Sequence, residues 1–246
     1  MFEKKAAIIL AAGKGKRMHS SLPKVLHQIG GKSLVRYLIE TISTLNLDRI
    51  SMVVGYKGEM VIQELSDFDI DFVWQKDQLG TGHAVQTARE NFGDFDGTIL
   101  VAAGDVPFLS AGTILELFKI HERNEASATC LSADFDNPEG YGRIIRQPDS
   151  DILLDIIEDS DADPETLKIR EINTGTFCFN SCDLFYALTK VNNSNSQKEY
   201  YLTDTIKILR NAGKTCAVWK AANPVEAKGV NSLEQLLTLE KEFKKS

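Results

Sequence analysis

The chain has 246 residues, of which 43% are hydrophobic and 26% charged, and its formal net charge is −7. This length and composition can build a full hydrophobic core, and we expect a single domain over residues 1–246. No apolar stretch is long enough to cross a bilayer, and the first apolar run leads into a basic loop instead of a cleavage site, so neither a membrane protein nor a secreted one is expected.

Strand-like and helix-like segments alternate through the first half of the chain. This alternation is typical of a parallel sheet covered by helices, a Rossmann-like α/β fold. The segments, in chain order, are Ala6–Leu10, Leu34–Leu45, Ile50–Val54, Glu59–Leu65, Ile70–Trp74, His83–Asn91, Thr98–Ala103 and Thr113–His121.

Strand candidates become more frequent from about Ala126, and turn residues increase there too. They are Ser127–Ala133, Arg143–Arg146, Leu153–Ile157 and Glu171–Phe179, followed by a helix at Leu202–Ala212, a strand at Thr215–Trp219 and a helix at Ser232–Lys244. We expect residues 126–246 to form a β-rich, lid-like half with the C-terminal helix, set against a first half of residues 1–125.

The loop after the first strand reads LAAGKGKRM and is soon followed by Pro23-Lys24. Gly13 and Gly15 lack a Cβ atom, which allows the backbone to approach a ligand closely. Arg17 adds a fork of donors and Lys24 a point charge, both of which suit phosphate oxygens. The loop is neither the dinucleotide fingerprint nor a P-loop, because Met18 occupies the place of a third glycine and no G-K-[ST] closes it.

Charge is concentrated in the same region. Residues 1–39 contain eight basic residues and one acidic residue, so the rest of the chain sums to −14. Such a distribution argues against a nucleic-acid-binding surface and favours one focused site for a small polyanion.

Asp105 follows the strand Thr98–Ala103 directly, at the edge where parallel sheets bind ligands. Mg²⁺ is commonly held by one or two protein oxygens together with substrate phosphates, so a single carboxylate there suits a magnesium ligand. An aspartate at this position could instead cap a turn or the next helix. Asn231 could supply a second oxygen, or it could cap the last helix, and the sequence leaves both open.

Seven ordered motifs resemble those of the sugar-phosphate nucleotidyltransferases. Nearly the whole chain is similar to the uridylyltransferase domain of bacterial N-acetylglucosamine-1-phosphate uridyltransferases. The matching stretches are LAAGKGKRM with LPKVLH, QLGTGHA, GDVP, GYGRI, EINTG, EYYLTD and GVN.

This resemblance assigns a role to individual positions. It implies that residues 1–125 are the nucleotide-binding half, that residues 126–246 are the sugar-binding half, and that the first loop binds the phosphates. UTP and N-acetylglucosamine 1-phosphate are the implied substrates. The implied nucleotide-binding residues are Leu10, Ala11, Ala12, Gly13, Lys24, Gln75, Gly80 and Thr81, with uracil at the last three. The implied sugar-binding residues are Gly142, Glu158, Asn173, Tyr201 and Thr203, and the implied Mg²⁺ ligands are Asp105 and Asn231.

A sugar 1-phosphate needs no general base to react, because its phosphate oxygen is already ionised. Lys24 and Arg17 are the expected catalytic residues: they would offset the repulsion between the two anionic substrates and stabilise the departing pyrophosphate. Two alternatives remain open. One is a pyrophosphorylase for another sugar, such as glucose 1-phosphate, or for another base; the other is a non-catalytic nucleotide-sugar sensor.

The chain lacks the hexapeptide repeats of the acetyltransferase part of the bifunctional members. We therefore expect uridylyl transfer without acetylation, and the oligomeric state is undecided. The four cysteines, Cys130, Cys178, Cys182 and Cys216, have no metal-ligand spacing and are expected to be buried free thiols, which favours the cytoplasm.

Overall fold

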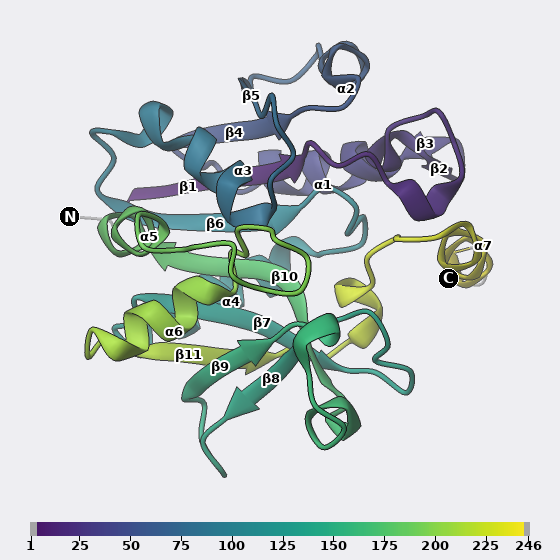
Figure 1. Ribbon diagram of the computed structural model, residues 1–246. Coiled ribbons are helices and arrows are strands. Elements are labelled where there is room, and N and C mark those ends of the chain that lie inside the picture. The colour runs from purple at the N-terminus through teal and green to yellow at the C-terminus, as the bar shows by residue number, and fades with distance from the viewer. Residues whose placement is uncertain (1–3, 244–246) are drawn as a thin grey trace.

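A computed structural model describes residues 4–243, in which a mixed central sheet carries helices on both faces (Figure 1). The strands along the main path of this sheet follow the order β11-β7-β10-β6-β1-β4-β5. Their bounds are β1 Lys4–Ala11, β4 Arg49–Val54, β5 Asp71–Trp74, β6 Gly97–Ala103, β7 Ala128–Asp134, β10 Glu171–Asn180 and β11 Cys216–Lys220.

The predicted parallel arrangement is confirmed for most of this sheet. β1 pairs in parallel with both β4 and β6, β4 with β5, and β7 with β11. Residues 6–9 of β1 are fully buried, as expected of an apolar strand covered on both faces. The exception is β10, which runs antiparallel to both β6 and β7 and so joins the two parallel parts.

Helices form one layer on each face of the sheet. Ile8 of β1 belongs to a core shared with α3, α5 and α6, whereas its neighbour Ile9 belongs to a core shared with α1, α2 and α4. Successive side chains of a strand point to opposite faces, which is why adjacent residues enter different cores. The helices of the two layers are α1 Leu34–Ser43, α2 Gly58–Glu64, α3 Thr81–Thr87, α4 Ala111–Arg123, α5 Ser181–Leu188 and α6 Asp204–Asn211. Helix α7 Leu233–Phe243 packs in a smaller core that includes Ile29 and Leu34.

Two hairpins extend from this framework. β8 (Arg143–Arg146) and β9 (Leu153–Ile157) form an antiparallel hairpin that joins the sheet where Arg143 pairs with Ile172 of β10. The shorter hairpin of β2 (Gln28–Ile29) and β3 (Lys32–Ser33) lies near α7, at the right of Figure 1. β7, β10 and β11 belong to the central sheet, so β8 and β9 are the only strands in the described part of residues 126–246 that lie off its main path.

Some local predictions differ from the structure. The helix expected over His83–Asn91 ends at Thr87 and is followed by a separate short turn at Arg89–Phe92. Helix α5 was not predicted, although Asn180 caps it by accepting a hydrogen bond from the backbone of Asp183 at 3.2 Å.

The cysteine prediction is partly wrong. All four thiols are free, but Cys182 is exposed because it lies on the first turn of the unpredicted helix α5, whereas the other three are buried. The predicted end of the last helix at Lys244 lies outside the described residues. Within residues 4–243, no helix has both the length and the apolar character that a membrane span requires.

Candidate functional site

The segments that follow β1, β5 and β6 meet at one edge of the sheet. They surround a cavity of about 440 Å³, which Glu199 also lines. The cavity walls include all eight predicted nucleotide-binding residues, namely Leu10, Ala11, Ala12, Gly13, Lys24, Gln75, Gly80 and Thr81, together with Asp105. Residues from three separate motifs are therefore brought together, as the parallel sheet requires.

The loop after β1 folds back closely against Lys24. Gly15 has a φ of +62°, and a Cβ atom at this position would lie 2.7 Å from the Cβ of Lys24. Any other residue would be strained and would push Lys24 away from the cavity. The glycine therefore allows the backbone of the loop after β1 to pass directly beside Lys24.

Gln75 presents a fixed amide to the cavity. Its side chain is 3% exposed, and Nε2 donates to the carbonyl of Gly80 at 3.1 Å and lies 2.9 Å from Nδ1 of His83. Both amide hydrogens are then engaged, so the Oε1 atom remains as an acceptor, and it takes no hydrogen bond from any residue in the described part of the chain. The sequence analysis did not single out His83 as a site residue, although it belongs to the QLGTGHA motif.

Lys24 lies between the two predicted metal ligands. Its ammonium group donates to the Asp105 carboxylate and, at 2.9 Å, to Oδ1 of Asn231. The Asp105 side chain is 8% exposed, and its main-chain carbonyl accepts a hydrogen bond from Val230 at 3.0 Å. This backbone hydrogen bond joins the segment before α7 to the end of β6. One oxygen of Asp105 and one of Asn231 therefore lie next to the same cation, the Lys24 ammonium.

These two oxygens suit a divalent metal that also binds phosphate. Among residues 4–243, no group of three or more histidine, cysteine, aspartate or glutamate side chains could hold a metal by itself. Mg²⁺, in contrast, is usually bound through one or two carboxylate-type oxygens, with water and substrate phosphates completing its shell. The Asp105 and Asn231 oxygens fit that role, and a bound metal would take the place of the Lys24 ammonium between them.

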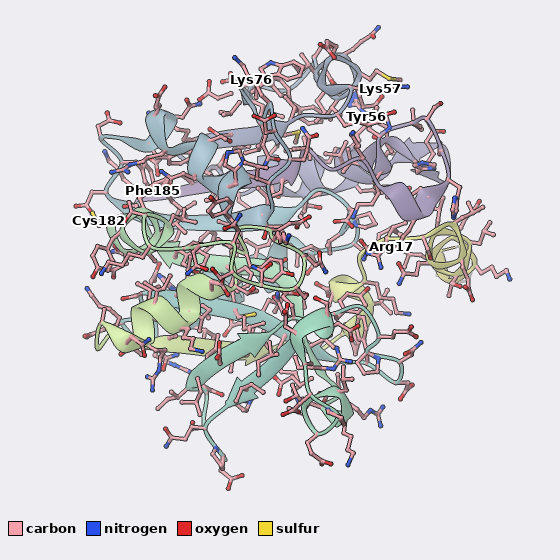
Figure 2. All side chains as sticks on the ribbon, viewed as in Figure 1. Arg17, Tyr56, Lys57, Lys76, Cys182 and Phe185 are labelled. Carbon is pink, nitrogen blue, oxygen red and sulfur yellow. The ribbon has the colours of Figure 1, made fainter. Side chains whose placement is uncertain are left out.

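Arg17 lies in a different place from the one expected. Instead of lining the cavity beside Lys24, it lines a neighbouring cavity of about 540 Å³, together with Tyr141, Lys228 and Gly229. Arg17 is exposed and forms no hydrogen bond or ion pair within the described residues, and Figure 2 shows it between the central body and α7.

The wall between the two cavities is thin. A Cβ atom on Gly229, which lines the second cavity, would lie 3.5 Å from the Asp105 carboxylate of the first. Tyr141 also belongs to this wall, and its hydroxyl donates to the carbonyl of Gly229 at 3.4 Å. Burial, with a further effect of the Asp105 charge, raises the pKa of Tyr141 to about 12, so it remains protonated at neutral pH. Tyr141 was not predicted as a site residue.

Three of the predicted sugar-binding residues lie together on the β8–β9 side. Glu158 accepts a hydrogen bond from the Thr203 hydroxyl at 2.8 Å, and a Cβ atom on Gly142 would lie 3.3 Å from the other carboxylate oxygen. Burial raises the pKa of Glu158, and the Thr203 hydrogen bond partly opposes this shift. Gly142 therefore lets the backbone pass close to the half-buried carboxylate of Glu158, where any side chain would be crowded.

The other two predicted sugar-binding residues border this group. The Asn173 backbone donates to the carbonyl of Gly142 at 2.8 Å, while its side-chain oxygen accepts from the backbone of Gly175 at 2.9 Å. The Tyr201 hydroxyl points towards the Asp161 carboxylate at 3.4 Å instead of towards Glu158.

Arg143 supports the region of Gly142 and Glu158, although the sequence analysis did not single it out. It is 2% exposed, binds Asp159 at 3.0 Å and also donates to the main-chain carbonyl of Tyr141. Its two partners each neighbour a predicted sugar-binding residue in the sequence, so Arg143 connects the chain on both sides of the pocket.

Known proteins share this architecture and sequence. The chain is 45% identical over 227 residues to "Bifunctional protein GlmU" of Lactobacillus helveticus, and 46% identical over 239 residues to the protein of the same name from Enterococcus faecalis. These alignments cover 92% and 97% of this chain but 49% and 52% of the relatives, so the chain spans about half the length of the curated relatives it matches.

The structure of a UDP-glucose pyrophosphorylase complexed with UDP-glucose superposes with a TM-score of 0.76 at 17% identity, covering 98% of this chain and 99% of the other. This likeness confirms the predicted α/β fold. The family model described as "MobA-like NTP transferase domain" matches residues 7–200, which include every residue that lines the cavity beside Lys24 but not Asn231. The chain therefore belongs to the MobA-like NTP transferase domain family.

Proposed function

We propose that this chain transfers the uridylyl group of UTP to N-acetyl-α-D-glucosamine 1-phosphate, giving UDP-N-acetylglucosamine and pyrophosphate. The observation that carries this proposal is the cluster of Lys24, Asp105 and Asn231 at the lip of a cavity lined by every predicted nucleotide-binding residue. The family match and the two GlmU relatives support the reaction class and the substrates.

The substrates divide between the two parts of the chain. Residues 1–125 supply the loop after β1, Gln75 and the Gly80 turn, and we assign the nucleotide to this half. Residues 126–246 supply the Glu158 region and Asn231, and we assign the sugar and the second metal oxygen to this half. The site then lies along the line where the two halves meet.

Uracil would be read by the amide of Gln75. A pyrimidine with an N–H between two carbonyl groups needs one acceptor and two donors, and the Gln75 Oε1 atom supplies the acceptor. Backbone N–H groups beside Gly80 and Thr81 are suitable donors, because this turn lines the cavity. His83 holds the Gln75 amide in position at 2.9 Å.

We propose Mg²⁺ as the cofactor, held by Asp105 and Asn231 together with the phosphates of the nucleotide. When bound there, the metal supplies positive charge that offsets the charge of the phosphate oxygens. The preference of Mg²⁺ for a few oxygen ligands, completed by substrate, supports this assignment.

The chemistry requires positioning and charge compensation. An ionised oxygen of the sugar phosphate attacks the α-phosphorus of UTP, a P–O bond forms, and the bond from the α-phosphorus to the bridging oxygen of the pyrophosphate breaks. No proton has to be removed from the attacking oxygen. We assign to Lys24 the compensation of charge at the reacting phosphates, and to Arg17, which lines the neighbouring cavity, the stabilisation of the leaving pyrophosphate.

The sugar would contact the region of Gly142, Glu158 and Thr203. A carboxylate accepts hydrogen bonds from sugar hydroxyls, and the amide of Asn173 can both donate and accept. Gly142 lets the backbone pass close to the Glu158 carboxylate, which a residue with a side chain would crowd. The similarity of GYGRI and EINTG to the uridyltransferase motifs supports an N-acetylated hexosamine as the substrate.

The test is pyrophosphate release with UTP and Mg²⁺ in the presence of N-acetylglucosamine 1-phosphate, glucosamine 1-phosphate or glucose 1-phosphate in parallel. Fast release with the acetylated sugar alone is expected. Release with glucose 1-phosphate instead would overturn the sugar assignment and keep the reaction class. Binding of UTP with no release in any reaction would mean that the chain is a nucleotide-sugar sensor.

A further inference from the structure

The turn between β4 and α2, residues 55–57, contacts both limbs of the loop that follows β1. At the start of the loop, the Tyr56 backbone N–H donates to the carbonyl of Ala12 at 3.1 Å. At its end, the Lys57 ammonium donates to the carbonyl of Ser21 at 2.7 Å. The loop between these two contacts includes Gly13, Gly15 and Arg17.

The ring of Tyr56 connects the two contacts. The Lys14 ammonium lies 5.7 Å from the centre of this ring, and the Lys57 ammonium lies 5.6 Å from it. Figure 2 shows Tyr56 and Lys57 close together, with Lys57 exposed at the surface. Cations near an aromatic ring are attracted to its face, so the ring links Lys14 on the loop to the lysine that holds Ser21.

The backbone of the turn is fitted to the loop. Gly55 passes so close to it that a Cβ atom would lie 2.9 Å from both the Cβ and the carbonyl oxygen of Ala12. Lys57 has a φ of 50° and a ψ of 40°, a left-handed conformation that costs free energy for a residue with a side chain. A glycine at position 57 would avoid this cost but would lose the contact with Ser21.

The two contacted limbs carry groups that line the nucleotide cavity. Lys14 lies on the first limb, and Lys24 follows Ser21 by three residues on the second, whereas Arg17 at the tip of the loop is exposed. We infer that the turn of Tyr56 and Lys57 is a positioning element that holds the phosphate-binding loop in the shape required to bind the nucleoside triphosphate. This inference rests on the proposed function for the identity of the ligand, but the contacts themselves are independent of it.

The decisive variant is Lys57→Met, which keeps the aliphatic stem and removes the donor to Ser21. Lys57→Arg keeps a cationic donor and is the rescue variant, and Lys57→Gly separates the backbone effect from the side-chain effect. Lys76→Met is the matched control: Lys76 is an exposed lysine just after β5, and it lies well apart from Lys57 in Figure 2. Thermal unfolding of each variant reports whether it is folded.

Loop opening can be measured without activity, because Lys14, Lys16 and Arg17 are trypsin cleavage sites within the loop. For Lys57→Met we expect cleavage at these sites to be about fivefold faster, and KM for UTP to rise by about the same factor, as the loss of one hydrogen bond predicts. KM for the sugar phosphate should not change. Lys57→Gly should resemble Lys57→Met, whereas Lys57→Arg and Lys76→Met should resemble the wild type.

Equal cleavage rates in Lys57→Met and the wild type would overturn the inference, as would equal acceleration by Lys76→Met. The proposed function fails separately: if the wild type binds UTP but releases no pyrophosphate, the cleavage rates and the UTP dissociation constants of the same variants still decide whether the turn positions the loop.

Discussion

The ammonium group of Lys24 donates to the carboxylate of Asp105, a residue 81 positions away in the sequence. The same ammonium binds Asn231, which is 207 positions from Lys24. The end of the first loop, the end of β6 and the segment before α7 are thus joined through one cation. Because Asp105 and Asn231 are also the proposed metal ligands, Lys24 and a metal compete for the same two oxygens.

The first prediction follows from this competition. In Lys24→Met, the Asp105 and Asn231 oxygens lose their cation, so the nucleotide-free protein should bind Mn²⁺ more tightly than the wild type does. Turnover should nevertheless fall by about a hundredfold, because a charge that acts on the reacting phosphates is lost. Titration of Mn²⁺ followed by electron paramagnetic resonance measures the first effect and pyrophosphate release the second. Unchanged Mn²⁺ affinity would contradict the shared site.

A second prediction compares the same substitution at two glycines of the cavity. A Cβ atom on Gly80 would lie 2.6 Å and 2.8 Å from backbone atoms of Tyr200, and the φ of Gly80 is +114°. Gly80→Ala should therefore lower the free energy of unfolding by about 2 kcal/mol or more. Urea denaturation measures this loss.

Gly13 is the matched control, because a Cβ atom there meets no heavy atom within 4 Å although the residue lines the same cavity. Gly13→Ala should leave stability within about 0.5 kcal/mol of the wild type. Its methyl group would occupy ligand space, so KM for UTP should rise instead. Equal stability of the two variants would show that the Gly80 turn can move away from Tyr200.

The sequence was sufficient to predict most of the central sheet. Strands such as β1 and β6 are continuous apolar runs buried on both faces, and this pattern is local and strong. The antiparallel direction of β10 was harder to predict from the sequence, because the direction of a strand depends on which strands become its neighbours and not on the residue pattern within it. Helix α5 is only eight residues long, and the exposure of Cys182 depends on it.

The candidate site was predictable where a motif follows directly from a strand. Lys24 and Asp105 are such cases, and the structure brings them into contact. The role of Arg143 could not be foreseen, because its partner Asp159 is fixed only by the turn after β9. The position of Arg17 beside a second cavity likewise depends on α7, which is more than 200 residues distant in the sequence.

A third prediction concerns Glu158, whose pKa is raised above the ordinary value of 4.5 mainly by burial. The ionised carboxylate is penalised in the folded state, so its contribution to stability is fully favourable below pH 4.5 and is lost as the pH rises through its folded-state pKa. Glu158→Gln should thus raise the unfolding temperature at pH 7 and have no such effect near pH 4. The same variant should increase KM for the sugar phosphate by about tenfold, since a charged acceptor is removed.

Glu165→Gln is the control for Glu158, because Glu165 is exposed in the same segment of the chain. It should change neither the pH dependence of unfolding nor KM. If Glu158→Gln were less stable than the wild type at pH 7, the hydrogen bond from Thr203 would outweigh the cost of burying the carboxylate, and the assigned direction would be wrong.

The last prediction concerns His121 of α4, which is 3% exposed and lies 2.9 Å from the Thr129 hydroxyl. Burial lowers its pKa from 6.5 to about 4. The unfolded chain takes up a proton near pH 6.5 while the folded protein does not, so this histidine makes stability fall as the pH drops from 6.5 towards 4, by about 3 kcal/mol in total.

Urea denaturation at pH 7.5 and pH 4.5 should show a larger loss of stability for the wild type than for His121→Gln. His19→Gln, at an exposed position, should lose as much as the wild type. Equal losses in the wild type and His121→Gln would mean that His121 becomes protonated in the folded protein without cost, which its burial between α4 and β7 argues against.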